Sequence, residues 1–291
     1  MISDEVRKKI KKIRIHTKRM MYTDISGDYL SAFKGSGLEF DQIREYQVGD
    51  DVRSIDWNSS AKMNKMMVKQ FVEERDRTII LAIDISASSL YSSSFELRQD
   101  LIAQLSAAIA YISGENKDKV GALFFTDQIE KWIPPSRGRA HSGKILETIF
   151  SIKPEGAGTD IESALTFLIK LKKKNAVVFF ISDWIDDLDS YSKVLKVASC
   201  EYDLIGVRVL DKCEESFPDV GLLQVRNPED GQVFTLDSRS TLKLEQFFAE
   251  KFLEQKKLFN KYKVDLLDLR VGRPFVTELI NFLHKRIRRQ I

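Results

Sequence analysis

An α/β fold with a doubly wound, mostly parallel sheet is predicted by two buried strands and by the regular alternation of strands and helices around them. Residues 79–83 read Ile-Ile-Leu-Ala-Ile, and residues 176–181 read Ala-Val-Val-Phe-Phe-Ile. Unbroken apolar runs of this kind are typical of parallel strands that are covered on both faces. From Thr78 onward most of the chain alternates between strands and amphipathic helices, which is the pattern of βαβ units.

The predicted elements divide the chain into three parts. Residues 1–34 predict a basic amphipathic helix and a loop, residues 35–75 predict a small β-rich region, and residues 76–291 predict the α/β domain. Within that domain the apolar spacing predicts helices and strands, with a hairpin insertion near residues 222–236. The helices are expected at residues 95–113, 144–150 and 242–262 and after Pro274; the strands are expected at residues 120–125, 129–133, 204–210 and 264–269.

The overall charge is nearly balanced, but the amino terminus is basic. The chain has 46 Lys and Arg against 43 Asp and Glu, a net charge of +3 over 291 residues, so we do not expect a nucleic-acid-binding protein. Between residues 1 and 22, eight basic residues accompany two acids. Val6, Ile10, Ile13 and either Met20 or Met21 fall on one side of this helix. We interpret it as a helix docked on the domain with a solvated basic face; peripheral membrane contact through that face is the alternative.

Targeting and redox signals are sparse. The longest apolar runs, residues 107–112 and 176–181, are six residues long, whereas a membrane-spanning helix needs roughly 20. The charged amino terminus is not followed by the apolar segment of a signal peptide. We therefore expect no transmembrane segment and a cytoplasmic location. Cys200 and Cys213 are expected to be reduced, structural thiols.

A cluster of polar residues follows the first buried strand. Asp84, Ser86 and Ser88 alternate with Ile85 and Ala87 directly after residues 79–83. Alternate residues of an extended chain point the same way, so the three oxygen-bearing side chains can converge. Ligands of open α/β sheets bind at the carboxyl ends of the strands, where this cluster lies. The cluster therefore predicts a ligand site for a hard cation.

Two more segments bring oxygen ligands to the same edge. Thr159 lies in a Gly-rich loop that leads into a helix, and Asp183 follows the strand at residues 176–181. Hydroxyl oxygens from the Ser and Thr residues with two carboxylates suit Mg²⁺, with Mn²⁺ or Ca²⁺ as alternatives, and leave a position for an anionic ligand. The competing interpretation is that Asp84 and Ser86 cap the next helix while Asp183 is solvated at a strand end.

This arrangement resembles the metal-ion-dependent adhesion site of von Willebrand factor A domains, whose fold is Rossmann-type. A second resemblance lies upstream, where several short motifs look like the signature of domain-of-unknown-function family 58. These motifs are Gly37-Leu38-Glu39-Phe40, Arg44-Glu45-Tyr46, Gly49-Asp50-Asp51-Val52-Arg53, Ile55-Asp56-Trp57, Val68-Lys69 and Glu73-Glu74-Arg75. Where similar proteins have Ser-Asp-Phe, this chain has Ser182-Asp183-Trp184.

The resemblance implies a bacterial protein-binding module that is not an enzyme. Members of the family are associated with MoxR-type AAA+ ATPases, which implies an adaptor or assembly factor that acts on such an ATPase or its client. The chain has no P-loop, dinucleotide fingerprint or nucleophile elbow, so ATP hydrolysis would belong to the partner. The alternative is a metal-dependent phosphoester hydrolase that combines Asp84 and Asp183 with acids of residues 50–56.

Three further features are candidate interaction elements. Trp184 is expected either at the rim of the cleft as a partner anchor or in the core. Arg137 and Arg139 lie in a segment, residues 134–141, that is expected to be an exposed basic loop and is a candidate partner contact. The charged block at residues 44–57 is interpreted as an ion-paired network that locks the small region onto the sheet; a partner-binding face or a second, acidic metal site are the alternatives.

Overall fold

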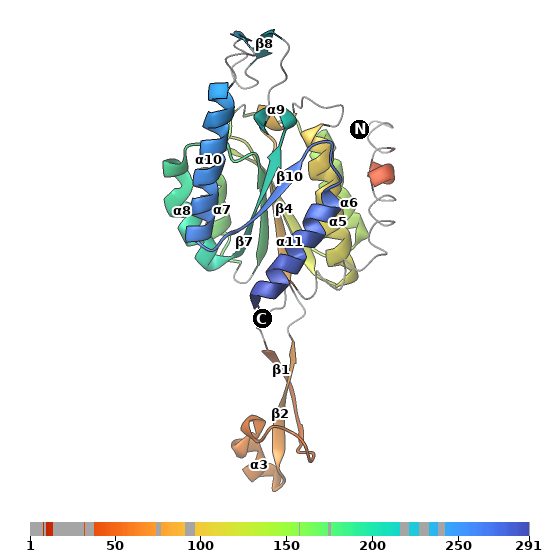
Figure 1. Ribbon diagram of the computed structural model, residues 1–291. Coiled ribbons are helices and arrows are strands. Elements are labelled where there is room, and N and C mark those ends of the chain that lie inside the picture. The colour runs from red at the N-terminus through yellow and green to blue at the C-terminus, as the bar shows by residue number, and fades with distance from the viewer. Residues whose placement is uncertain are drawn as a thin grey trace.

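The computed structural model describes residues 8, 10–13, 32, 38–73, 77–90, 97–156, 158–173, 176–215, 221–226, 233–237 and 242–290. Its centre is a six-stranded sheet in the order β10-β7-β6-β3-β4-β5 (Figure 1). The strands are β3 (Thr78–Asp84), β4 (Lys119–Phe125), β5 (Ile129–Ser136), β6 (Val177–Ser182), β7 (Asp203–Leu210) and β10 (Asp265–Arg270). Only β5 runs antiparallel, so the predicted doubly wound, mostly parallel sheet is confirmed.

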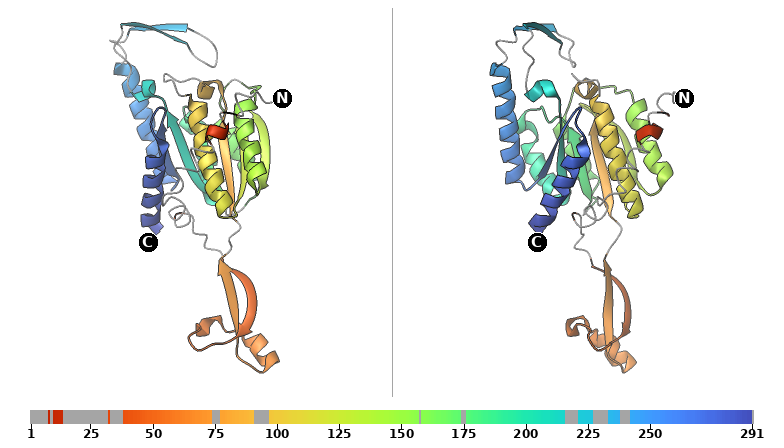
Figure 2. Two further views of the ribbon diagram at one scale, coloured as in Figure 1. Left: turned by 90° about the vertical axis from the view of Figure 1, so that its right-hand side faces the viewer. Right: turned by 45° about the vertical axis from the view of Figure 1, so that its right-hand side comes forward.

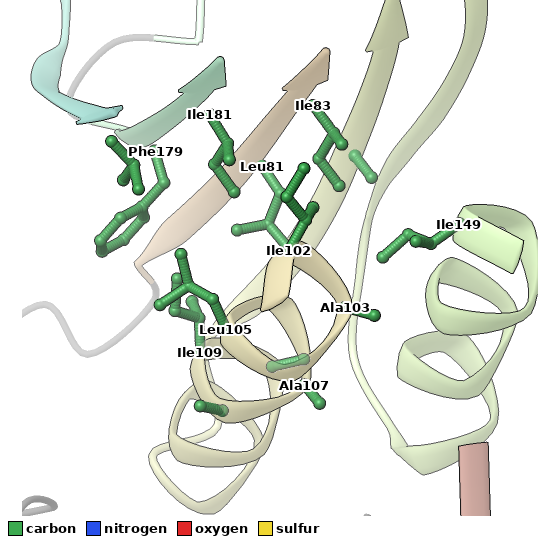
Figure 3. Packing of buried hydrophobic residues seen from close by; sticks show 14 of the residues in the cluster. Leu81, Ile83, Ile102, Ala103, Leu105, Ala107, Ile109, Ile149, Phe179 and Ile181 are labelled. Carbon is green, nitrogen blue, oxygen red and sulfur yellow. The ribbon is translucent and has the colours of Figure 1, made fainter. Parts of the chain in front are cut away.

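Helices cover both faces of this sheet. One face carries α5 (Arg98–Glu115), α6 (Arg139–Ser151) and α11 (Phe275–Gln290), and the other carries α7 (Ile161–Lys170), α8 (Leu188–Glu201) and α10 (Leu242–Lys261). The alternation within β3 explains the two layers, because Leu81 and Ile83 pack under α5 while Ile80 and Ala82 face the opposite layer. Figure 3 shows Leu105 and Ile109 of α5 among the side chains that fill the first layer.

Residues 38–73 form a separate arm. Strands β1 (Leu38–Glu45) and β2 (Met67–Glu73) pair antiparallel, and between them lie the 3-10 turn η1 (Val52–Ser54) and the short helix α3 (Trp57–Met63). Asp56 begins α3 by accepting hydrogen bonds from the backbone N–H groups of Asn58 and Ser59. Both views in Figure 2 show this arm standing clear of the α/β body, on the side where β3 begins.

The charged block lies in this arm, but it does not lock the arm onto the sheet. Arg44 forms two 2.7 Å hydrogen bonds with the carboxylate of Asp50, and Lys69 lies 3.7 Å from the carboxylate of Asp56. These contacts join the two strands of the arm to its own turns. The prediction of an ion-paired network is confirmed, whereas the role assigned to it is wrong because the arm projects away from the body (Figure 1).

The amino-terminal helix is docked as predicted where the structure describes it. Residues 8 and 10–13 are helical, Ile10 and Ile13 are buried in the core layer that contains α5 and α6, and Lys8, Lys11 and Lys12 are exposed. Val6, Met20 and Met21 lie outside the described residues. No helix among the described residues has the length and apolar content needed to cross a lipid bilayer.

The expected exposed loop at residues 134–141 is largely regular structure. Pro134 and Pro135 belong to β5, and Arg139 and His141 belong to α6, which leaves only Arg137 and Gly138 between them. Two prolines are tolerated because β5 is an edge strand, where a missing N–H costs no ladder hydrogen bond on the open side. The insertion near residues 222–236 is a hairpin of β8 (Leu222–Arg226) and β9 (Val233–Asp237), as predicted.

Candidate metal site

The candidate site lies where the winding of the sheet reverses. The chain continues from β3 to β4 on one side and later returns to β6 on the other side of β3. Asp84 is the last residue of β3 and Ser182 is the last residue of β6, its parallel neighbour. The carboxyl ends of two strands that diverge in this way leave the crevice in which α/β proteins bind their ligands. Both predicted carboxylates, Asp84 and Asp183, therefore lie at this reversal point, at the carboxyl ends of β3 and β6.

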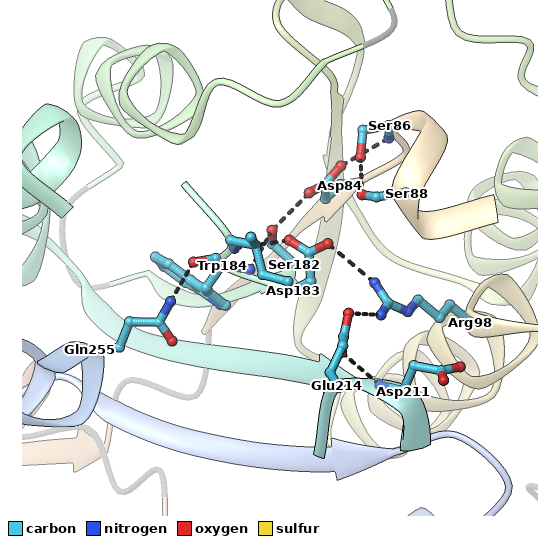
Figure 4. Close-up of polar contacts among 11 residues, drawn as sticks. Asp84, Ser86, Ser88, Arg98, Ser182, Asp183, Trp184, Asp211, Glu214 and Gln255 are labelled. Carbon is cyan, nitrogen blue, oxygen red and sulfur yellow. Dashed lines mark hydrogen bonds and ion pairs between the residues drawn. The ribbon is translucent and has the colours of Figure 1, made fainter. Parts of the chain in front are cut away.

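Three predicted ligands come together in the turn after β3. One carboxylate oxygen of Asp84 accepts a 2.9 Å hydrogen bond from the backbone N–H of Ser86, and the hydroxyl oxygens of Ser86 and Ser88 are 3.0 Å apart (Figure 4). The backbone N–H of Ile85 donates to the carbonyl of Phe125 on β4, which holds the turn against the sheet. The short helix α4 (Ala87–Leu90) follows directly. Asp84 and Ser86 are buried, whereas Ser88 is partly exposed.

Asp84 is held on its other side by β6. The hydroxyl of Ser182 donates to the second carboxylate oxygen of Asp84 at 2.7 Å. Burial, with the negative charge of Asp183 added to it, raises the pKa of Asp84 to about 7, although hydrogen bonds from Ser86 and Ser182 act in the opposite direction. The buried Asp84 carboxylate, with Asp183 close to it and hydroxyl oxygens beside it, belongs to a donor set that fits a hard divalent cation. The cation would favour the ionised form of Asp84.

Asp183 is oriented by an unusual turn. Trp184 has φ of +59°, in the left-handed region that large side chains rarely adopt. Its backbone N–H donates to the Ser182 hydroxyl at 3.1 Å, and its ring packs against Phe180, Tyr191 and Phe259. Because this ring is completely buried, the prediction that Trp184 lies at the rim of the cleft is wrong and the alternative, a core position, is confirmed. Its role is to fix the turn that carries Asp183.

The loop that carries Thr159 reaches the same edge through β4 and β5. The carboxylate of Glu130 accepts hydrogen bonds from the Thr126 hydroxyl and from the backbone N–H groups of Glu155 and Gly156, at 2.8 to 3.0 Å. The backbone N–H of Asp160 donates to the Thr126 carbonyl. Thr159 is partly exposed and makes no hydrogen bond with the other four predicted ligands in the described structure. Its participation as a ligand therefore stays a prediction.

A buried arginine, Arg98, lies beside the site and was not predicted from the sequence. Arg98 donates to the free oxygen of the Asp183 carboxylate at 3.2 Å and forms an ion pair with Glu214 of α9 (Lys212–Glu215) (Figure 4). Glu214 in turn accepts a hydrogen bond from the backbone N–H of Asp211. Arg98 lies three residues before Leu101 on the buried stripe of α5. A basic residue on the apolar side of a helix is the signal that could have identified it.

The remaining candidates do not join this site. Arg137 and Arg139 follow β5, whose end pairs with the beginning of β4, so they lie at the opposite edge of the sheet from Asp84. The acids of residues 50–56 lie in the far part of the arm, next to α3 (Figure 1). Asp50 is paired with Arg44, and Asp51 and Asp56 cap η1 and α3. Among the described residues no three His, Cys, Asp or Glu side chains form a metal-binding group, and Glu74 lies outside them. A hydrolase that combines both acid sets is not supported.

The sheet order, with its reversal of winding between β3 and β6, is that of a von Willebrand factor A-like α/β fold. A solved structure with the same fold is BatB of Bacteroides thetaiotaomicron, with a TM-score of 0.50 and 16% identity over 73% of this chain and 99% of that one. The chain belongs to the family described as protein of unknown function DUF58, whose model matches residues 42–257.

Two further proteins are similar to this chain. An uncharacterized protein of Mycobacterium tuberculosis, Rv1480, is 25% identical over 283 residues, which are 96% of this chain and 89% of the relative. The von Willebrand factor A domain of SpRpn10 matches with a TM-score of 0.40 and 13% identity, over 71% of this chain and 94% of that one.

Proposed function

We propose that this protein is a divalent-cation-dependent protein-binding module. Asp84, Ser86, Ser88, Thr159 and Asp183 hold the cation, with Mg²⁺ favoured and Mn²⁺ or Ca²⁺ as alternatives. The observation that carries the proposal is the buried carboxylate of Asp84 at the point where the winding reverses, with its pKa raised by burial and by Asp183. When bound, the cation supplies a positive charge to which an acidic side chain of a partner can coordinate.

Each of these residues has a separate task. The Ser86 N–H and the Ser182 hydroxyl fix the two oxygens of Asp84, so the carboxylate is oriented before any ligand arrives. The hydroxyls of Ser86 and Ser88 add neutral oxygen donors that leave the charge of a cation uncancelled. Because Ser88 and Thr159 are partly exposed while Asp84 and Ser86 are buried, the partner would approach from the side of Ser88 and Thr159.

The family resemblance suggests the class of protein partner, and the exposed hydrophobic residues of the arm are consistent with a protein-binding role. We infer an adaptor or assembly factor for a MoxR-type AAA+ ATPase or its client. The far part of the arm, residues 46–66, carries five exposed large hydrophobic residues, a density that is typical of protein-interaction surfaces. These residues are Val48, Val52, Trp57, Met63 and Met66. Figure 2 shows the arm on the side where β3 begins, whereas Asp84 is the last residue of β3, so the module has two separate surfaces for partners.

The experiment combines cation binding with partner capture. Isothermal titration calorimetry with MgCl₂ is expected to show one binding site on the wild type and none on Asp84→Asn. The tagged wild type is expected to retain a purified MoxR-type ATPase in Mg²⁺, and Asp84→Asn is expected to lose it in the same buffer. Keeping Mg²⁺ constant and changing only Asp84 excludes effects of metal removal on the ATPase itself. Equal retention by both proteins would refute the proposed mechanism.

A further inference from the structure

The guanidinium of Arg98 lies in an electrostatically unfavourable position. It is the first residue of the 18-residue helix α5, where the positive end of the helix dipole disfavours a cation, and only 5% of the residue is exposed. No side chain caps this helix start. Within the described part of the chain the Nε atom of Arg98 is buried without a hydrogen-bond partner. A buried charge is retained in such surroundings only when its partners compensate for the lost hydration.

The compensation comes from two carboxylates on different elements. Nη1 of Arg98 contacts Asp183 after β6, and Nη2 pairs with Glu214 on α9, which follows β7. Burial alone lowers the pKa of Arg98, but the charges of Glu214 and Asp183 outweigh it and raise the pKa above its usual range. Arg98 therefore stays charged and connects the proposed metal site to α9.

The contact uses the oxygen that a cation would need. The other oxygen of Asp183 accepts a 3.0 Å hydrogen bond from the backbone N–H of Ile185. Arg98 thus engages the one carboxylate oxygen of Asp183 that the turn leaves free. A second cation close to the guanidinium would meet direct repulsion in surroundings from which water is largely excluded. The Arg98 guanidinium and a bound divalent cation therefore compete for the same oxygen of Asp183.

We propose that Arg98 is an internal competitor for the divalent cation at Asp183, and that cation binding transfers Arg98 from Asp183 to Glu214 alone. This inference rests on the proposed function. With a divalent cation bound, the two charges of Asp84 and Asp183 balance it, and Arg98 and Glu214 balance each other. Glu214 is the retained partner because its second oxygen is already held by the Asp211 N–H. Arg98 is a positioning residue that sets the cation affinity of the site and links its occupancy to α9.

Two substitutions of the full chain test the competition in opposite directions. Arg98→Met removes the charge but keeps an unbranched side chain, and it is expected to tighten Mg²⁺ binding by roughly tenfold or more, within the usual range of coupling between neighbouring sites. Glu214→Gln leaves Asp183 as the one carboxylate in contact with Arg98, with the charge of Asp211 acting from nearby, and is expected to weaken Mg²⁺ binding. Arg98→Lys keeps the charge and is expected to stay nearer the wild type than Arg98→Met does. Isothermal titration calorimetry gives the dissociation constants, and thermal unfolding with and without MgCl₂ gives an independent measure.

A merely structural ion pair predicts a different result. In that case Arg98→Met would lose stability to the same extent with and without Mg²⁺ and would bind the cation no more tightly than the wild type. Under competition, Mg²⁺ stabilises Arg98→Met more than it stabilises the wild type. If Arg98→Met fails to fold, Glu214→Gln decides, since unchanged or tighter Mg²⁺ binding by that variant overturns the inference. Binding by the wild type without tightening in Arg98→Met overturns only the competition, whereas no binding by either protein overturns the proposed function as well.

Discussion

Replacing Asp84 by Asn should remove a loss of stability that the wild type shows as the pH rises in the absence of divalent cations. In the folded protein burial and Asp183 raise the pKa of Asp84 to about 7, whereas the unfolded carboxyl has its ordinary value of 3.8. The folded state therefore binds the Asp84 proton more tightly than the unfolded state does. The contribution of Asp84 to the free energy of unfolding is fully present below about pH 4 and is lost as the pH rises toward 7.

The size of the effect follows from the two pKa values. A change from about 4 to about 7 corresponds to on the order of 4 kcal/mol of unfolding free energy between acid and pH 8. Asn has the same shape, can accept the Ser86 N–H and can donate to the Ser182 hydroxyl, but it does not ionise. Asp84→Asn should therefore be close to the wild type in stability near pH 4 and clearly more stable than the wild type near pH 8.

Urea unfolding in metal-free buffers at a series of pH values measures the difference. Adding Mg²⁺ at pH 8 should recover stability in the wild type, because a ligand that binds only the folded state stabilises it, and should leave Asp84→Asn unchanged. A difference between the two proteins that stays constant from pH 4 to pH 8 would refute the electrostatic reasoning about this carboxylate.

Three further predictions concern the loop and the arm. In Gly156→Ala the new Cβ would lie 1.8 Å from an Asp127 carboxylate oxygen, so we expect the free energy of unfolding to fall by about 1–3 kcal/mol and Mg²⁺ binding to weaken. The control is Gly158→Ala in the same loop, where no atom lies closer than 3.9 Å to the new Cβ, and it should behave as the wild type in both assays. In Glu130→Gln the acceptor of two loop N–H groups loses its charge, and we expect about 1 kcal/mol of destabilisation at pH 7. Partial burial raises the pKa of Glu130, but hydrogen bonds from Gly156 and Thr126 outweigh it and lower the pKa below its ordinary value of 4.5, so the loss should fade as the pH falls below that value. Equal stability losses at pH 7 and at acid pH would contradict this. Asp50→Asn should increase hydrogen exchange in residues 42–70 and leave β3 unaffected, because Arg44, the ion-pair partner of Asp50, lies within the arm. Exchange that rises throughout the body would show that the arm is packed on the body.

The sheet and the polar residues that follow its two buried strands could be predicted because their sequence patterns are local. Residues 79–83 and 176–181 are apolar without interruption, so both strands and their carboxyl ends were identifiable, and the polar residues that follow them fall at one edge by the rules of parallel sheets. The contact between Ser182 and Asp84 adds a partner that the same reasoning placed nearby without assigning it a role.

The features that the sequence did not reveal depend on contacts between distant segments. The ion pair of Arg98 joins α5 to α9 across 116 positions, and no local pattern relates the two. The burial of Trp184 depends on Phe259 of α10, and no local pattern within residues 38–73 shows that the arm stands clear of the body (Figure 2). Periodicity predicts which side of an element is buried, but it does not predict which element covers that side.

Anomalous diffraction from crystals soaked in Mn²⁺ shows whether five side chains share one divalent cation. We expect a single anomalous peak among the oxygens of Asp84, Ser86, Ser88, Thr159 and Asp183, absent from crystals of Asp84→Asn. Crystals of the wild type with no peak at this position, or with the peak only elsewhere on the molecule, would contradict it.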